Sequence, residues 1–175
     1  MKIQGVSLCL LGMTFFLCSV QARSIKRCSP SMDTNPVKES FQGIKGAIQT
    51  KDTLKNVTIL SNLHSIKPLD MCCVTRELLE FYVERVFKYR EKLSLQISRA
   101  VSSISNSFLA LQRTVQPCKE HNLCPCSEEA TDATRNINNN YEELEVQSAV
   151  IKSLGELDVF IAWIDKNYHQ ETSTA

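Results

Sequence analysis

The chain has 175 residues, of which 43% are hydrophobic and 22% are charged, and its formal net charge is +1. This length fits one domain after a short leader, and the near-neutral charge argues against nucleic acid or another polyanion as a partner. Eight cysteines make the redox compartment the first question, because it decides whether they are disulfides, metal ligands or nucleophiles.

Residues 1–24 have the features of a secretory signal peptide. Lys2 precedes VSLCLLGMTFFLCSV, an apolar stretch of fifteen residues without a charge. This stretch is too short to span a bilayer comfortably, and the small residues after it fit cleavage before Arg23 or before Ile25. We therefore expect a signal peptide in residues 1–24, a folded domain in residues 25–175, and a product that is secreted, extracellular and not inserted in the membrane.

The first half of the expected domain predicts two helices joined by a long connector. Pro36 suits the first turn of a helix over residues 35–48. Residues 51–70 show no sustained period, which predicts a connector with a short helical turn. A second helix, with apolar residues at helical spacing from Val74, is expected to end near Tyr89. The apolar stripe of the first helix is Val37, Phe41, Ile44 and Ile48.

The second half predicts a long helix and then a helical region with a shift in its pattern. The long helix runs from about Leu93 to Gln116, and Pro117 is expected to stop it. Further on, the apolar stripe passes from Leu144 to Val150 in six residues, where a continuing heptad needs seven. The sequence therefore predicts a kink or a short break near Glu145 to Ser148, between the two stripes.

These patterns predict an all-α protein. The chain has only five glycines and five prolines, and it has no alternating β-type run of any length. The expected architecture is a compact bundle of four main helices plus shorter helices, with the apolar stripes forming its core.

Six cysteines remain in the expected domain, because Cys9 and Cys18 of the eight lie in the leader. An even number in a secreted chain implies three disulfides. Cys124 and Cys126 flank a proline in an extended stretch, so their side chains leave the same face roughly 6 to 7 Å apart and can meet an adjacent pair at a helix start. Other connectivities stay open, including a swap of partners within the double bridge. The predicted pairs are Cys72 with Cys124, Cys73 with Cys126 and, by elimination, Cys28 with Cys118.

Two chemical alternatives use the same polar residues. The segment CKEHNLCPC holds His121 among three cysteines and, with Cys72 and Cys73, could form a zinc cluster, but oxidation is favoured behind a signal peptide. A secreted hydrolase needs a nucleophile and a base, and the sequence has only three histidines, no HExxH, no GxSxG and no glycine-rich phosphate loop. We therefore expect no metal, no cofactor and no enzymatic activity.

The sequence contains one acceptor triplet for N-glycosylation, Asn56-Val57-Thr58. It lies in the expected connector, and an exposed connector of a secreted protein favours its use. We therefore expect an N-linked glycan on Asn56.

Four stretches carry a family resemblance: CCVTRELLEFYVERVF, SSISNSFLALQ, the Cys-Pro-Cys within CKEHNLCPCSEEATDATR, and AVIKSLGELDVFIAWIDKN. They resemble the interleukin-10 family of helical cytokines, in the branch that contains interleukins 19, 20 and 24, and the resemblance covers essentially the whole chain. It implies a secreted ligand that brings together the alpha and beta chains of the interleukin-20 receptor, whose cytoplasmic tails carry Janus kinases that activate STAT factors. One departure is that relatives carry Asn-x-Thr where this chain has Asp132-Ala133-Thr134.

The resemblance also implies two receptor-binding faces. One combines the first helix, the connector after it and the last helix. The other combines the start of the first helix with parts of the two middle helices. Residues implied on the first face are Lys51, Asp52, Lys55, Asn56 and Thr58 in the connector, with Asp165 and Lys166 nearby on the last helix.

Two further expectations concern assembly and an alternative function. The founding member of the family is a domain-swapped dimer, but here disulfides would hold both ends of the segment 118–127 that has to act as the hinge, so we expect a monomer. The alternative function is that of a secreted saposin-like lipid-binding or membrane-active protein, which also combines helices with several cysteines. That class has a shorter domain and no adjacent cysteine pair.

Overall fold

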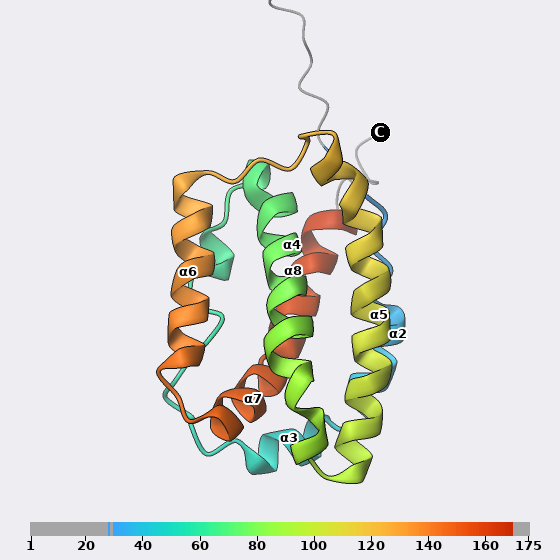
Figure 1. Cartoon of the computed structure of the whole chain (residues 1–175), viewed down its shortest axis with the longest axis vertical. Helices are drawn as coiled ribbons and strands as arrows, with labels where there is room; N and C mark the ends of the chain where they lie inside the picture. The colour runs from blue at the N-terminus through green and yellow to red at the C-terminus, as the bar shows by residue number, and fades with distance from the viewer. Residues whose placement is uncertain (1–27, 29, 170–175) are drawn as a thin grey trace, which may run out of the picture.

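The computed structural model describes Cys28 and residues 30–169, so the expected signal peptide of residues 1–24 lies outside the described residues (Figure 1). Every regular element in this part of the chain is helical, which confirms the predicted all-α class. The first half contains α2 (Asn35–Gln42), α3 (Lys45–Lys51), the 3-10 helices η1 (Leu63–Ser65) and η2 (Pro68–Asp70), α4 (Met71–Phe81), the π-helix η3 (Tyr82–Val86) and the 3-10 helix η4 (Phe87–Lys92). The second half contains α5 (Leu95–Glu120), α6 (Glu128–Glu142), α7 (Val146–Gly155) and α8 (Leu157–His169).

The helices form one bundle with α4 and α8 at its centre (Figure 1). α5 and α6 stand on either side of this pair, and α3 and α7 lie at one end. α2 packs against α5 and α8, α4 packs against α5 and α6, and α3 packs against α7. The Tyr168 hydroxyl of α8 donates a 3.0 Å hydrogen bond to the Thr75 hydroxyl of α4, which joins the two central helices. Among the described helices, none combines the length and the apolar character needed to cross a membrane.

The core is an aromatic cluster centred on Tyr82, which is fully buried. Its hydroxyl donates a 2.9 Å hydrogen bond to the backbone carbonyl of Ser153, so the polar end of the ring is satisfied. Burial raises the pKa of Tyr82 well above its ordinary value, which keeps the hydroxyl protonated as a donor. The cluster ties both halves of the chain together. The rings with centroids 5.3 to 5.8 Å from that of Tyr82 belong to Phe81, Phe87, Phe108 and Phe160.

The first predicted helix is present as two helices, α2 and α3, with an interruption at Gly43. The Ile44 N–H bonds to the Phe41 carbonyl at 3.0 Å, one residue closer along the chain than in an α-helix, and this tightens the turn. All four residues of the predicted apolar stripe are buried, with 5% exposure or less. The predicted core face is therefore confirmed, whereas the prediction of one continuous helix is wrong.

Two predicted helix ends differ from the structure. The helical segment that begins with α4 continues through η3 and η4 to Lys92, past the expected end near Tyr89. α5 continues through Pro117 for three more residues, so the prediction that this proline stops the helix is wrong. Pro117 removes one backbone hydrogen bond near the helix end, while the next residue, Cys118, is buried and bonded to Cys28. The disulfide that anchors Cys118 therefore outweighs the loss of one hydrogen bond at Pro117.

The predicted break in the C-terminal region is confirmed, and a second break follows it. α6 and α7 are separate helices, and the Glu145 side chain caps α7 by accepting a 3.1 Å hydrogen bond from the Ser148 N–H. Backbone hydrogen bonds from Gln147 and Ser148 hold the pKa of Glu145 below its ordinary value. The second break lies at Glu156, between α7 and α8. The apolar stripe continues through Glu156, so apolar periodicity did not predict this second break.

Candidate receptor-binding surface

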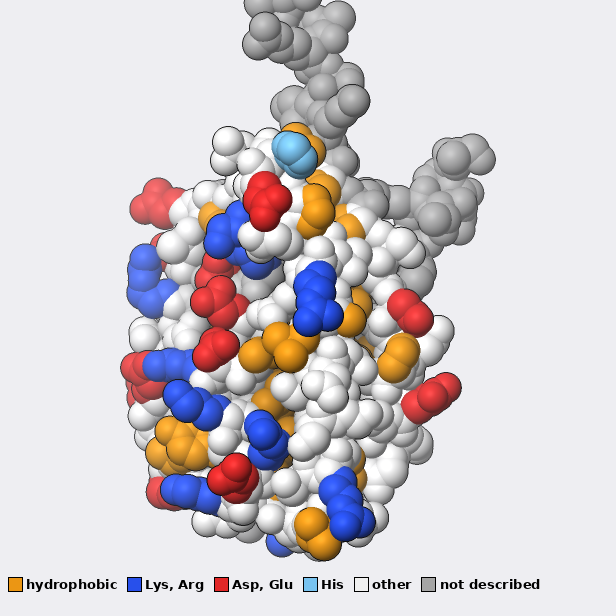
Figure 2. Space-filling view, turned by 45° about the vertical axis from the view of Figure 1, so that its right-hand side comes forward, with side chains coloured by type: hydrophobic (Ala, Val, Ile, Leu, Met, Phe, Trp, Pro, Cys, Tyr) orange, Lys and Arg blue, Asp and Glu red, His pale blue; other side chains and the backbone are white. Residues whose placement is uncertain are grey.

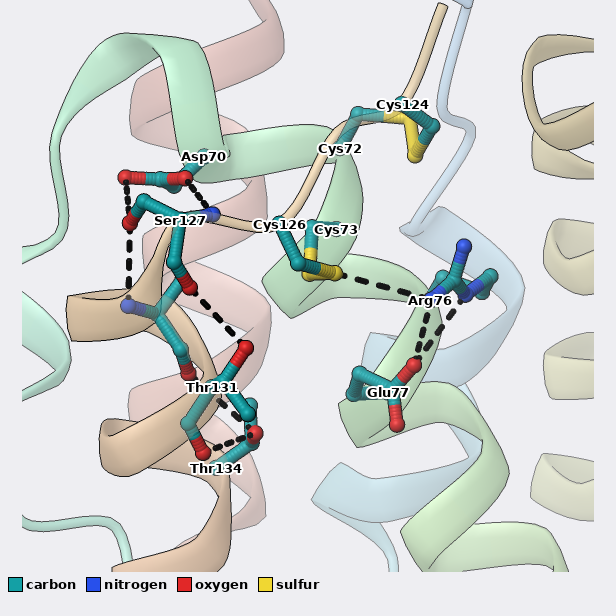
Figure 3. Close-up of a disulfide and its surroundings, with 11 residues drawn as sticks. Asp70, Cys72, Cys73, Arg76, Glu77, Cys124, Cys126, Ser127, Thr131 and Thr134 are labelled. Carbon is teal, nitrogen blue, oxygen red and sulfur yellow. Dashed lines mark hydrogen bonds and ion pairs between the residues drawn. A yellow bond between two sulfur atoms is a disulfide. The ribbon is translucent and has the colours of Figure 1, made fainter. Parts of the chain in front are cut away.

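Three disulfides fix the end of α5 and the segment after it to other parts of the chain, and Figure 3 shows the two that join this segment to α4. The pairs are Cys28 with Cys118, Cys72 with Cys124 and Cys73 with Cys126, with Cα atoms 5.7, 5.2 and 5.3 Å apart. They are the same pairs as those expected from the sequence. Sulfur atoms joined in this way do not act as thiolate ligands of zinc. Across the described residues, no group of three His, Cys, Asp or Glu side chains could hold a metal ion.

α2 and α3 face α7 and α8 along a line of contact that we name the seam. Three ion pairs cross it: Lys38 with Asp165 at 2.5 Å, Lys45 with Asp158 at 2.8 Å, and Lys152 with Asp52 at 3.1 Å. The partners follow each other in opposite order on the two sides, so the two pairs of helices run antiparallel. The first two ion pairs are partly exposed, with side-chain exposures of 25 to 47%, so each contributes little stability by itself but aligns the helices.

Between the ion pairs of Lys38 and Lys45 the seam is hollowed into a shallow groove of about 160 Å³. Its lining includes Phe41 of α2 and Ile161 and Ala162 of α8, which are apolar. The lysines and aspartates of the two ion pairs also line it. An apolar centre with a charged rim is the composition found at protein–protein interfaces.

The end of α3 and the connector after it carry five of the seven residues implied on the first receptor face, with Lys51 as the last residue of α3. Four of them are exposed and can reach a partner or, in one case, carry a glycan. Asp52 is different, because its carboxylate pairs with Lys152 and only 17% of its side chain is exposed. The four exposed residues are Lys51, Lys55, Asn56 and Thr58.

The other two residues, Asp165 and Lys166, lie at the opposite end of the seam. Asp165 pairs with Lys38 near the start of α2, whereas Asp52 pairs with Lys152. Asp158 and Asp165 lie seven residues apart on α8, which is about 10 Å along the helix axis. The expectation that Asp165 and Lys166 lie near the connector is therefore wrong, because the antiparallel packing puts them beside the beginning of α2.

Lys38, Lys45 and Asp158 belong to the same surface, although sequence reasoning did not select them. A signal was present, because the two lysines are seven residues apart and so are Asp158 and Asp165. Seven residues return a side chain to nearly the same face of a helix. In this structure the equal spacings let each of the two lysines pair with an aspartate of α8.

The second implied face involves the start of α2 with α4 and α5. α4 and α5 enclose a shallow groove of about 330 Å³, lined by residues that include Arg76 and Glu80 of α4 and Leu109 and Arg113 of α5. Leu109 is 36% exposed, so this face also offers an apolar contact. Figure 2 shows basic and acidic side chains interspersed with hydrophobic ones on the side of the bundle that it displays.

Comparisons with known proteins give the family. The sequence model described as Interleukin 10 matches residues 16–169. Interleukin-19 of Homo sapiens is 57% identical over 171 residues, covering 96% of this chain and 97% of that protein, and interleukin-19 of Mus musculus is 55% identical over 177 aligned residues, covering 100% of both. The crystal structure of human interleukin-19 matches with a TM-score of 0.73 at 56% identity, covering 82% of this chain and 94% of that chain.

The helical bundle and its three disulfides are those of a helical cytokine. The chain belongs to the interleukin-10 family, and it is a cytokine and not an enzyme. The predicted resemblance to the branch of interleukins 19, 20 and 24 is confirmed, and the likeness at 55 to 57% identity is to interleukin-19. This membership takes the place of the saposin-like and hydrolase alternatives.

Proposed function

We propose that this chain is a secreted cytokine that binds the alpha and beta chains of the interleukin-20 receptor and brings them together, so that Janus kinases on their cytoplasmic tails activate STAT factors. The likeness to interleukin-19 over the full length of both chains supports this function. The observation that carries it is the seam, where three ion pairs align two sets of helices beside an exposed connector.

The mechanism is physical juxtaposition. One receptor chain binds the seam and the connector, and the other binds the start of α2 with α4 and α5. Once one receptor chain is bound, the second binds from a high effective concentration at the membrane, and the two tails are held close together. The ion pairs and disulfides keep the two faces in a fixed relation, so the distance between the receptor chains is set by the bundle.

The direct test is binding of the purified protein to the two soluble receptor ectodomains. We expect a complex that contains one cytokine and both ectodomains. Lys55→Glu should weaken the binding of one ectodomain by about tenfold if this lysine is among the few residues that carry most of the binding energy. Lys88→Glu is the matched control, since it makes the same charge change at an exposed position outside the seam. A protein that binds neither ectodomain, or only one of them, would refute the proposed function.

A further inference from the structure

The connector loop of residues 52–60 begins at a partly buried ion pair. The Asp52 Oδ2 atom lies 3.1 Å from Lys152 Nζ of α7. The other carboxylate oxygen, Asp52 Oδ1, accepts a 3.0 Å hydrogen bond from the Leu54 N–H. The first turn of the loop is thus fixed by a side chain that is itself anchored on α7.

The same loop ends at a second carboxylate, that of Glu156, which is buried. Its two oxygens accept hydrogen bonds from the Ile59 N–H at 3.0 and 3.1 Å, and Oε2 also accepts one from the Leu60 N–H at 2.8 Å. Hydrogen bonds to a charged acceptor are among the strong ones in proteins. Glu156 Oε1 also lies 3.7 Å from Lys152 Nζ. The two carboxylates that hold the ends of the loop therefore both lie beside Lys152.

Lys152 and Glu156 are buried beneath the loop. Lys152 is 7% exposed and Glu156 is 8% exposed, so neither side chain is available for contact with a receptor. A buried charge is tolerated when it is paired and hydrogen-bonded, and here the cation lies between two carboxylates whose remaining acceptors are used by loop N–H groups.

We propose that Lys152 and Glu156 are positioning residues for receptor binding. Together with Asp52 they form a latch that fixes the conformation of loop 52–60 and presents the exposed side chains in its middle. A loop that is already in its bound shape loses less conformational entropy on binding. If the latch is broken, only a fraction of molecules has the competent loop, and the affinity falls by that fraction. This inference rests on the proposed function for its receptor readout, but not for its readout in the free protein.

The test uses two latch variants and one control, with the disulfides intact. Glu156→Gln keeps an oxygen acceptor and removes the charge, whereas Lys152→Met removes the cation and keeps the length of the side chain. Glu143→Gln repeats the first change at an exposed glutamate. Hydrogen exchange is followed at the amides of Ile59 and Leu60 and at buried amides of α5. Binding is measured separately for each receptor ectodomain.

Both latch variants should exchange the Ile59 and Leu60 amides at least about tenfold faster, with α5 unchanged, and should bind one ectodomain about tenfold more weakly while the other binds as before. The control should match the wild-type protein. Unchanged exchange at these two amides overturns the latch, whether or not the receptor assignment holds. Faster exchange with equal losses for both ectodomains overturns the positioning role, because it indicates general unfolding. If the wild-type protein binds neither ectodomain, the proposed function and the positioning role fail together, and exchange still decides whether the latch fixes the loop.

Discussion

Asp70 accepts two hydrogen bonds from Ser127, one from the backbone N–H at 2.9 Å and one from the hydroxyl at 2.8 Å. The same hydroxyl oxygen accepts a 3.1 Å hydrogen bond from the Ala130 N–H and so caps α6 (Figure 3). Asp70 is buried and directly precedes α4. One serine therefore joins the starts of two helices, next to the double disulfide.

We expect Ser127→Ala to lower the free energy of unfolding by about 2 kcal/mol, because it removes a helix cap and leaves a buried carboxylate oxygen without this donor. Ser94→Ala is the matched control, since Ser94 precedes α5 without making a side-chain cap. Urea unfolding with the disulfides intact measures both variants. Equal losses for the two serines would show that the link to Asp70 contributes nothing.

The disulfide pairing should hold in the secreted protein. Peptide mapping without reduction is expected to find Cys28 with Cys118, Cys72 with Cys124 and Cys73 with Cys126. A swap to Cys72 with Cys126 would contradict the predicted geometry of the double bridge and leave the fold intact. Free thiols would contradict both the pairing and an oxidising compartment.

Asn56→Gln should remove the N-linked glycan and make the secreted protein migrate faster on a gel. Asn56 is exposed in the connector and heads the only acceptor triplet in the sequence. Residue 132 is an aspartate that forms an ion pair with Arg135, so it offers no second site. Treatment of the wild-type protein with an endoglycosidase is the control, and an unchanged mobility of the variant would show that the site is not used.

The secreted protein should be a monomer. A domain swap would require the segment 118–127, from the last turn of α5 to the start of α6, to open as a hinge, but Cys118, Cys124 and Cys126 tie it to other parts of the same chain. Light scattering at micromolar concentration should give the mass of one chain plus its glycan. A stable mass of two chains would show that the disulfides do not prevent exchange.

Much of the fold follows from apolar periodicity. The residues from Val37 to Ile48 that repeat at helical spacing are buried, and the register shift after Leu144 marks a real break between helices. Periodicity did not reveal the interruptions at Gly43 and Glu156, because the stripe stays in register across both. Periodicity also cannot show that α5 continues past Pro117. The helix is held there by the disulfide of Cys118 with Cys28, which is 90 residues away in the sequence.

The candidate site was harder to predict, because its geometry depends on partners that are distant in sequence. Asp52 read as an exposed connector residue, but it is held by Lys152, a residue 100 positions later. Lys152 and Glu156 read as part of a family motif, while their role in holding the loop required the positions of the Ile59 and Leu60 N–H groups. Local patterns do not carry this information.

The most direct test of the central claim is STAT phosphorylation in cells that express both chains of the interleukin-20 receptor, one chain, or neither. Purified protein should raise STAT phosphorylation only when both chains are present, because a single chain leaves no second tail to bring close. A response that persists in cells without either chain would contradict the central claim.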